Sequence, residues 1–245
     1  MSAEQQVDYS VLEREMEAPL QDGGGLFCGQ NSEGFAINGV TYQWVKGSKV
    51  TWGYDFSRAG TLSYDDMVSA TKEFLKEISE CCDLFFEHIK NAAIANIKII
   101  SVRLDGSSGV LADMEIPPPQ SRADSTQLRG RVDDSENWVL ADNPPSNTID
   151  FFRTMLHEFE HACGLGHKPP SIKKPALIAP IYSPTMRHLQ QADKDELQRR
   201  YGSAQAPIDP PASGRLPVNY KAVHEVEQSG RKWKGTVSGV LLPVD

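Results

Sequence analysis

The sequence lacks three features that would place it in other classes of protein: a secretory signal, a long apolar run and an excess of basic residues. The first eight residues, MSAEQQVD, are acidic and polar where an export signal has a basic end and then an apolar run. Lys and Arg number 25 against 33 Asp and Glu, a net charge of -8 that argues against a nucleic-acid partner, because phosphate binding needs a concentrated basic surface. With 39% hydrophobic and 24% charged residues, the composition is that of an ordinary globular protein, so we expect no membrane partner.

Cysteine is also scarce. The chain has four, Cys28, Cys81, Cys82 and Cys163, and two of them are adjacent. Neighbouring cysteines form only a strained bridge with each other, so no disulfide framework can be predicted. The cysteines therefore do not indicate whether the protein works in an oxidising or a reducing compartment.

The length of 245 residues is enough for one well-filled hydrophobic core. Residues 1–33 are polar and glycine-rich and lack a sustained apolar period, which predicts a flexible leader or pro-segment. Residues 203–245 begin as a proline-rich linker and continue as a tail too short for a core of its own. We therefore expect one main domain over residues 34–202.

Within that domain, the spacing of apolar residues predicts both strands and helices. Residues 63–78 begin with Ser63 and place apolar side chains at helical intervals, and residues 148–163 do the same before Gly164. The run 94–102 is apolar and β-branched, as in a buried strand. In chain order we expect two short strands within 40–54, a helix at 63–78, strands at 94–102 and 109–116, a polar loop at 120–147, a helix at 148–163 and a last helix near 193–201.

The most informative segment reads HEFEHACGLGH and runs from His157 to His167. Histidines four positions apart on a helix lie on one face and can bind one cation, and Glu158, beside the first, can reach a metal-bound water. Gly164 can leave helical geometry at little steric cost, which turns the chain so that His167 returns as a third ligand. We therefore expect His157, His161 and His167 to bind one metal ion.

Three neutral imidazoles suit zinc and leave a fourth position for water, as in catalytic rather than closed structural sites. Zinc lowers the pKa of its bound water to ~7, so Glu158 can accept a proton as the water attacks a peptide carbonyl. The alternative is that the histidines only decorate a surface, but a chance match of the whole pattern is far rarer than a match of two histidines. Cys163 is a soft ligand in principle, and its place on the helix favours packing instead.

This extended pattern resembles that of the metzincin metallopeptidases, which share a methionine turn beneath the metal. Met186, in YSPTM, resembles that turn. The flanking residues are similar to those of the matrixins, the family of the matrix metalloproteinases. DGSSGVLA at 105–112 resembles their aspartate-glycine segment, and DDSENW at 133–138 resembles their acidic loop. Residues 189–193, together with Gln198, Tyr201 and Gly202, resemble their closing helix. The resemblance covers residues from about 40 to 202.

The resemblance to matrixins also implies a structural calcium site. Its expected ligands are three carboxylates and three backbone carbonyls: those of Asp105, Asp133 and Glu136, and those of Gly106, Ser108 and Val110. Calcium prefers several hard oxygens from carboxylates and turn carbonyls, so this set of donors suits it. The alternative is that the acidic side chains are merely solvated in loops, where acidic residues are common.

The chain departs from the matrixin pattern at several positions. Where the family has histidines that bind a structural zinc, this chain has Asp113 and Arg131, and the loop that carries the other ligands is deleted, so we expect no second zinc. Nineteen positions separate His167 from Met186, more than in the typical matrixin, and His188 stands where proline is usual. These differences make the placement within the metzincins firmer than the placement within the matrixins.

Cys28 lies upstream of the first expected strand, about where a matrixin pro-segment holds its inhibitory cysteine. A thiolate is a good zinc ligand and can displace the catalytic water. Its surroundings, FCGQNS, lack the arginine, proline and aspartate that flank this cysteine in the family. Two interpretations stay open: an inhibitory switch with at most partial effect, or a plain cysteine in a flexible leader, which the missing neighbours favour.

The resemblance implies an α+β fold, a metzincin-like zinc peptidase domain with a twisted mixed sheet, an antiparallel edge strand, two long helices and a small C-terminal subdomain. The implied activity is that of a monomeric zinc-dependent metalloendopeptidase whose protein or peptide substrate adds to the edge strand by main-chain hydrogen bonds. One alternative is a zinc-binding interaction module without turnover, which the presence of Glu158 argues against. Another is an inhibitor-like or scaffolding protein without metal.

The cellular location rests on two opposing signals. A calcium site favours an extracellular setting, where calcium is abundant, while the missing export signal favours the cytoplasm. We prefer the extracellular prediction.

Overall fold

The computed structural model describes Cys28, the backbone of residues 36–37 and 40–41, residues 42–168, 173–183 and 185–204, and the backbone of 218–228 and 231–241. The chain divides into two compact units, Met1–Ala204 and Gln205–Asp245. The expected leader, apart from Cys28, lies outside the described residues. Among the helices described, none is long and apolar enough to cross a membrane.

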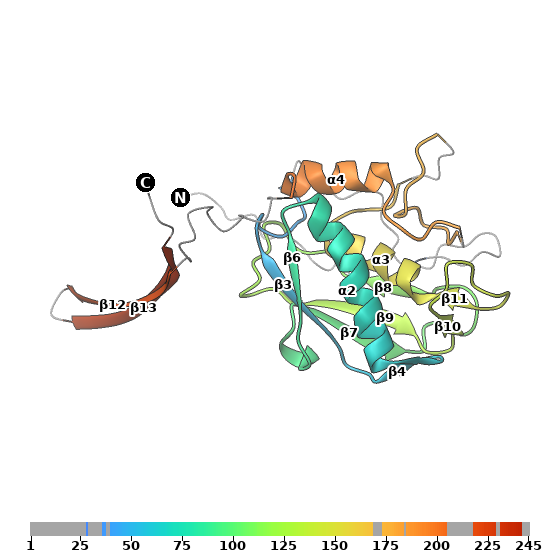
Figure 1. The fold of residues 1–245 in the computed structure, drawn as a ribbon, viewed down its shortest axis with the longest axis horizontal. Coiled ribbons are helices and arrows are strands. Elements are labelled where there is room, and N and C mark those ends of the chain that lie inside the picture. Colours follow the sequence, from blue (N-terminus) through green and yellow to red (C-terminus); the bar gives the residue numbers. More distant parts are fainter. Residues whose placement is uncertain are drawn as a thin grey trace. The chain divides into compact units, whose positions relative to one another are not determined.

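The first unit is built on a five-stranded mixed sheet (Figure 1). From one edge to the other, its strands are β6 (Phe85–His88), β3 (Lys49–Tyr54), β7 (Ile97–Val102), β9 (Leu128–Asp133) and β8 (Ala112–Met114). The pairs β3–β6, β3–β7 and β7–β9 are parallel, whereas β8 runs antiparallel to β9 at the edge. The predicted mixed sheet with an antiparallel edge strand is therefore confirmed.

One prediction about the chain between 120 and 147 is wrong. The segment expected to be a polar loop contains β9, a central strand of the sheet, and the short strand β10 (Trp138–Val139). The strand β9 reads LRGRVD, and its inward-facing Leu128 and Val132 are buried while charged residues alternate with them. Only two apolar side chains, separated by Gly130, mark this alternation, so it was too short to predict a strand from the sequence.

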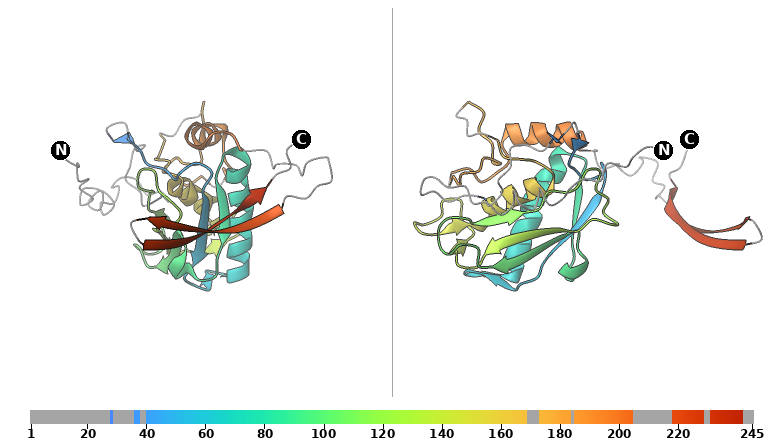
Figure 2. Two further views of the ribbon diagram at one scale, coloured as in Figure 1. Left: turned by 90° about the vertical axis from the view of Figure 1, so that its left-hand side faces the viewer. Right: turned by 180° about the vertical axis from the view of Figure 1, so that it is seen from behind.

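Among the described residues, three α-helices accompany the sheet. They are α2 (Tyr64–Cys81), α3 (Phe151–Ala162) and α4 (Gln191–Tyr201). The helix α2 begins with a capping box in which Ser63 and Asp66 bind each other's backbone N–H, which satisfies two donors at the helix start. It passes in front of the sheet in Figure 1 and behind it in the reverse view of Figure 2, so it covers one face.

The helix α3 is the innermost element of this unit. All of its twelve residues are buried, and it packs against both α2 and β8. A helix enclosed on every side is held by its neighbours rather than by its own helix propensity. Its last carbonyl, that of Ala162, accepts a hydrogen bond of 2.7 Å from the indole Nε1 of buried Trp44.

The remaining elements are short. They are β1 (Ala36–Ile37), β2 (Val40–Thr41), β4 (Arg58–Ala59), β5 (Leu62–Ser63), the 3-10 turn η1 (Ala92–Ile94), β10 and β11 (Ile149–Asp150). The second unit contains an antiparallel pair of strands, β12 (Val218–Gln228) and β13 (Arg231–Leu241).

Candidate metal centre

The helix α3 presents the first two predicted ligands. Its N-cap residue Asp150 accepts a hydrogen bond of 3.1 Å from the backbone N–H of Arg153, which fixes where the helix begins. His157 and His161 follow one turn apart on a single face, with ring centroids 4.9 Å from each other. Glu158 also lies on this helix and is buried.

The chain reverses at Gly164, directly after the helix. This glycine has φ +83°, the left-handed region that side chains other than glycine rarely adopt. A Cβ atom at this position would also overlap the backbone carbonyl of Tyr42. Both facts require glycine here, and the turn that it makes possible returns His167 toward α3.

The three histidines converge on one point. The Nε2 atom of His167 lies 3.3 Å from Nε2 of His157 and 3.1 Å from Nε2 of His161. Backbone carbonyls hold the far sides of two rings: Nδ1 of His157 is 2.8 Å from Leu177 O, and Nδ1 of His161 is 2.7 Å from Leu165 O. Because a carbonyl only accepts hydrogen bonds, each Nδ1 carries the proton and each Nε2 turns its lone pair toward the centre.

Burial keeps these imidazoles in the neutral form that binds a metal. It lowers the pKa of His157 and His161 well below the usual value, and the neighbouring rings lower it further. Burial also lowers the pKa of His167 to about 4. All three rings are therefore uncharged near neutral pH.

The buried carboxyl of Glu158 lies in the same place. Burial raises its pKa well above the usual value, and a hydrogen bond from Cys28 opposes that shift. Within the described part of the protein, its Oε1 atom has no hydrogen-bond partner. A buried oxygen of this kind calls for a donor such as water.

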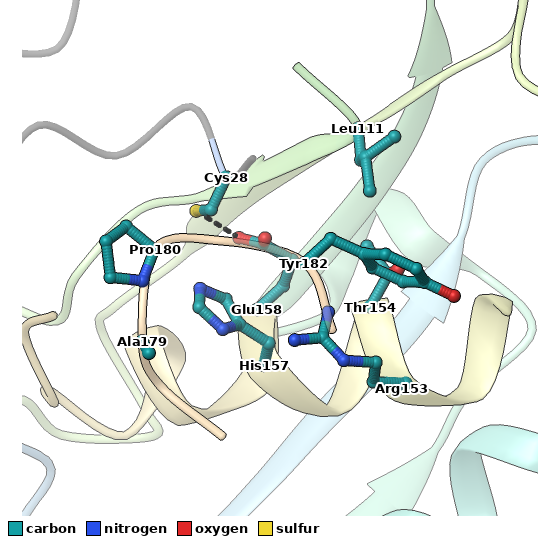
Figure 3. Close-up of a pocket in the computed structure, with 9 residues that line it drawn as sticks. All are labelled: Cys28, Leu111, Arg153, Thr154, His157, Glu158, Ala179, Pro180 and Tyr182. Atoms are coloured by element: carbon teal, nitrogen blue, oxygen red, sulfur yellow. Dashed lines mark hydrogen bonds between the residues drawn. The ribbon is translucent and has the colours of Figure 1, made fainter. Parts of the chain in front are cut away.

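Cys28 completes the group from the N-terminal side. Its Sγ atom is 3.4 Å from Nε2 of His161, and its thiol donates to Oε2 of Glu158 at 3.5 Å (Figure 3). Its backbone N–H donates to Pro180 O at 3.3 Å. The sulfur and the three imidazole nitrogens all lie within 4.8 Å of one another, and no other such group of three or more ligands occurs among the described residues.

This donor set fits zinc. Zinc takes imidazole nitrogen and thiolate sulfur in a tetrahedron with bonds of about 2.0–2.3 Å, so its ligand atoms stand ~3.3–3.8 Å apart. The separations of 3.1, 3.3 and 3.4 Å between neighbouring donors approach that spacing. The residues present therefore match the size and chemistry of a zinc site.

The sequence interpretation missed Arg153, which lies one helical turn before His157. Its Nε donates to Met186 O at 2.9 Å, its Nη2 donates to Ile181 O at 3.3 Å, and its guanidinium stacks 4.3 Å above the Tyr182 ring. Burial lowers the pKa of this arginine to about 10. A charged residue on the apolar stripe of α3 was the available signal that it must bind something.

Arg153 thereby ties the segment that carries the expected methionine turn to α3. Met186 is partly buried and packs against the core, and its N–H donates to Ser183 O at 3.1 Å. Between α3 and this segment is a cavity of about 10 Å³, room for about one water, bordered in Figure 3 by Glu158, Pro180 and Tyr182.

The acidic residues predicted to bind calcium link two loops. Oδ2 of Asp133 accepts from the N–H of Asp105 at 3.2 Å, and Oε1 of Glu136 accepts from the N–H of Ser108 at 2.6 Å. Asp105 in turn accepts from the N–H of Val110 at 3.1 Å. Burial raises the pKa of Glu136, and the negative charges of Asp133 and Asp105 add to that shift. Calcium binding stays a prediction.

The residues that depart from the matrixin pattern form contacts with other side chains. Asp113 and Arg131 face each other across β8 and β9, and Nε of Arg131 donates to both carboxylate oxygens at 2.9 and 3.0 Å. His188 Nδ1 lies 2.7 Å from Oε1 of Glu77 on α2. Cys163 is fully buried in the core.

Comparisons with known proteins give a consistent result. A sequence model of the family described as Matrixin matches residues 43–202. Matrix metalloproteinase-25 is 38% identical over 104 residues in Mus musculus (42% of this chain, 16% of that protein) and 38% identical over 114 residues in Homo sapiens (45% and 19%). Matrix metalloproteinase-17 of Homo sapiens is 27% identical over 180 residues (67% and 29%). The match thus spans less than a third of the length of each relative.

Proposed function

Because this chain belongs to the matrixin family, we propose that residues 34–202 form the catalytic domain of a zinc-dependent metalloendopeptidase. One observation carries this proposal: three histidine Nε2 atoms converge beside the buried carboxyl of Glu158. Residues 1–33 would then form a leader or pro-segment, and residues 203–245 a linker and tail. We place the enzyme outside the cell because its expected calcium site suits that setting. We also propose that it acts as a monomer.

The proposed mechanism assigns a separate task to each residue. Zinc at this position would polarise the peptide carbonyl and acidify water. His157, His161 and His167 would hold the ion, and the backbone carbonyls of Leu177 and Leu165 fix the orientation of the first two rings. Glu158 accepts the proton of the attacking water and delivers it to the departing amine. Its pKa, raised by burial, suits a group that must take and release a proton.

The proposed substrate is an extended segment of a protein or peptide. The strand β8 ends the sheet, and no other described strand pairs with its outer edge. That edge can therefore accept a strand from a substrate. The strand β8 packs against α3, and Leu111, just before it, borders the same cavity as Glu158. A peptide paired with β8 would therefore run past the metal centre.

Removing zinc should abolish the activity. We expect a peptide library to be cut by the intact protein, to survive after treatment with a zinc chelator, and to be cut again after zinc is restored. Cleavage-site mass spectrometry would show this directly and would define the sequence preference. Cleavage that persists in metal-free protein would contradict the proposal, as would a Cys28→Ser protein that binds one zinc and cuts nothing.

We further propose that Cys28 can occupy the fourth ligand position and limit activity. The sulfur lies 3.4 Å from His161 Nε2, where a substrate carbonyl and water would need to enter. Replacing Cys28 by Ser should therefore raise the hydrolysis rate of the full-length chain, as should a chain that begins at Gly34. Equal rates in all three proteins would contradict this switch. Activation by truncation alone would mean that the leader blocks the cleft without the thiol.

Calcium should stabilise the fold through Asp105, Asp133 and Glu136. An ion that binds only the folded state adds ~2.7 kcal/mol to the free energy of unfolding when its free concentration is about 100 times its dissociation constant. Thermal unfolding with rising calcium should therefore shift upward in wild type and not in Asp133→Ala/Glu136→Ala. The matched control is Asp134→Ala, an exposed acid of the same loop that should respond like wild type. If calcium raised the unfolding temperature of the double variant as much as that of wild type, the predicted calcium site would be wrong.

A further inference from the structure

A second cavity lies between α2 and the edge strand β6, and none of its lining residues belongs to the metal centre. It measures about 440 Å³. Its lining includes three aromatic rings, those of Trp52, Phe86 and His88. It also includes Lys72 and Lys76, two exposed residues of α2 that we call the rim lysines. We call this cavity the α2–β6 groove.

The groove favours a negatively charged occupant. Lys72 has no ion pair among the described residues, and the pair between Lys76 and Glu80 is exposed and 3.5 Å long, which makes it weak. The groove has one acidic lining residue, Glu87, which lies 2.6 Å from Lys49 outside the groove, so lysines outnumber acids in the lining by two to one. Burial lowers the pKa of His88, and Lys72 and Lys90 lower it further, as expected in a positive field.

The groove also offers a place for a polypeptide backbone. The strand β6 ends the sheet and pairs with β3 alone among the described strands. Its outer edge therefore presents N–H and C=O groups that an extended segment can bind. Phe85 on this strand is 42% exposed, so the edge carries apolar surface as well. An acidic segment with interspersed apolar residues matches all three properties.

The N-terminal leader has that composition. Residues 1–27 hold six of the acidic side chains and a single basic one, Arg14, which gives a net charge of -5 out of -8 for the whole chain. Its acids alternate with apolar side chains: Val7, Tyr9, Val11, Leu12, Met16 and Leu20. The strands 218–228 and 231–241 carry a net charge of +2, the same sign as the groove, and are the poorer match. We propose that residues 4–22 of the leader bind the α2–β6 groove.

The length of the leader permits this. Glu13 precedes Cys28 by 15 residues, and an extended segment of that length spans up to ~50 Å. A domain of this size has a radius of gyration of only ~15 Å, so the segment can reach around it from the metal centre. Docking would anchor the leader by charge and so hold Cys28 at high local concentration near the histidines. The docking itself does not depend on peptidase activity.

Cross-linking of the full-length protein tests the proposal. A carbodiimide joins carboxylates to lysines that already touch, so mass spectrometry should find links from the acids of residues 4–22 to Lys72 or Lys76. The ion pair between Lys49 and Glu87, at 2.6 Å, provides an internal positive control. A mixture of isotopically heavy and light chains distinguishes links within one chain from links between two.

Three outcomes would overturn the docking. If the leader were linked only to other lysines, it would bind elsewhere. If it formed no links while the Lys49–Glu87 control did, it would not be docked. Links between heavy and light chains would assign the groove to a second copy. Within-chain links to the two rim lysines are the expected result.

A second measurement uses Arg14, the single trypsin site in residues 1–27. Lys72→Glu/Lys76→Glu should speed cleavage after Arg14 by about five- to tenfold, the factor expected when two surface ion pairs become repulsive. The matched control is Lys46→Glu/Lys194→Glu, which changes the net charge equally outside the groove and should cleave like wild type. Circular dichroism would confirm that both variants fold. Equal cleavage rates in all three proteins would overturn the proposal.

Discussion

Replacing Glu158 by Gln should lower peptide hydrolysis by ~100-fold or more while the protein keeps one zinc per chain, because removing a general base typically costs that much. Glutamine has nearly the same shape, and the three imidazoles are held by Leu177, Leu165 and the turn at Gly164 rather than by Glu158. The loss should therefore fall on turnover. Steady-state kinetics with a fluorogenic peptide, together with elemental analysis, would measure both quantities.

A matched control lies two positions away on the same helix. Glu160 is also fully buried, but the charges that act on its carboxyl come chiefly from Asp193 and Lys168. Glu160→Gln thus makes the same chemical change in the same helix and should leave turnover near that of wild type. A Glu158→Gln protein with wild-type turnover and one bound zinc would refute the assigned mechanism. Equal losses in both variants would point to damage to α3 instead.

The histidine site was accessible from the sequence because its geometry is local. His157 and His161 are one helical turn apart, and the glycine and third histidine follow within six residues. The contacts that orient these rings were not accessible in the same way. Leu177 contributes a backbone carbonyl, which its side chain does not reveal, and it lies 20 positions from His157. The approach of Cys28 to Glu158 joins residues 130 positions apart, a distance that only the tertiary fold closes.

The strands show the same division between local and tertiary causes. The β-branched residues of β7 favour an extended buried conformation by themselves, so that strand was predicted. The edge strand β6 reads FFEH and leaves Phe85 exposed, and it was missed because its pairing with β3, not its own pattern, makes it a strand. Likewise β9 carries two arginines, one of which pairs with Asp113 across the sheet. Such charges are compatible with a strand once a partner faces them.

Replacing Gly164 by Ala should destabilise the domain and reduce its zinc content. The substitution forces a side chain into φ +83° and drives its Cβ against the carbonyl of Tyr42, a combination that should cost about 3 kcal/mol or more. For a domain of 150–250 residues, that loss lowers the melting temperature by ~6–12 °C. Relief of the overlap would shift the turn that returns His167, so zinc affinity should fall as well.

Gly47→Ala separates backbone strain from steric overlap in this experiment. Gly47 also has a positive φ, +76°, but a Cβ there would meet nothing closer than an Asp83 oxygen at 3.7 Å, an ordinary contact. It should therefore cost only the strain, about 1–2 kcal/mol, and leave zinc binding unchanged. Thermal unfolding and zinc titration of the two variants would show the difference. If Gly164→Ala proved no more costly than Gly47→Ala and kept full zinc affinity, the close approach of Gly164 to Tyr42 would not be what positions His167.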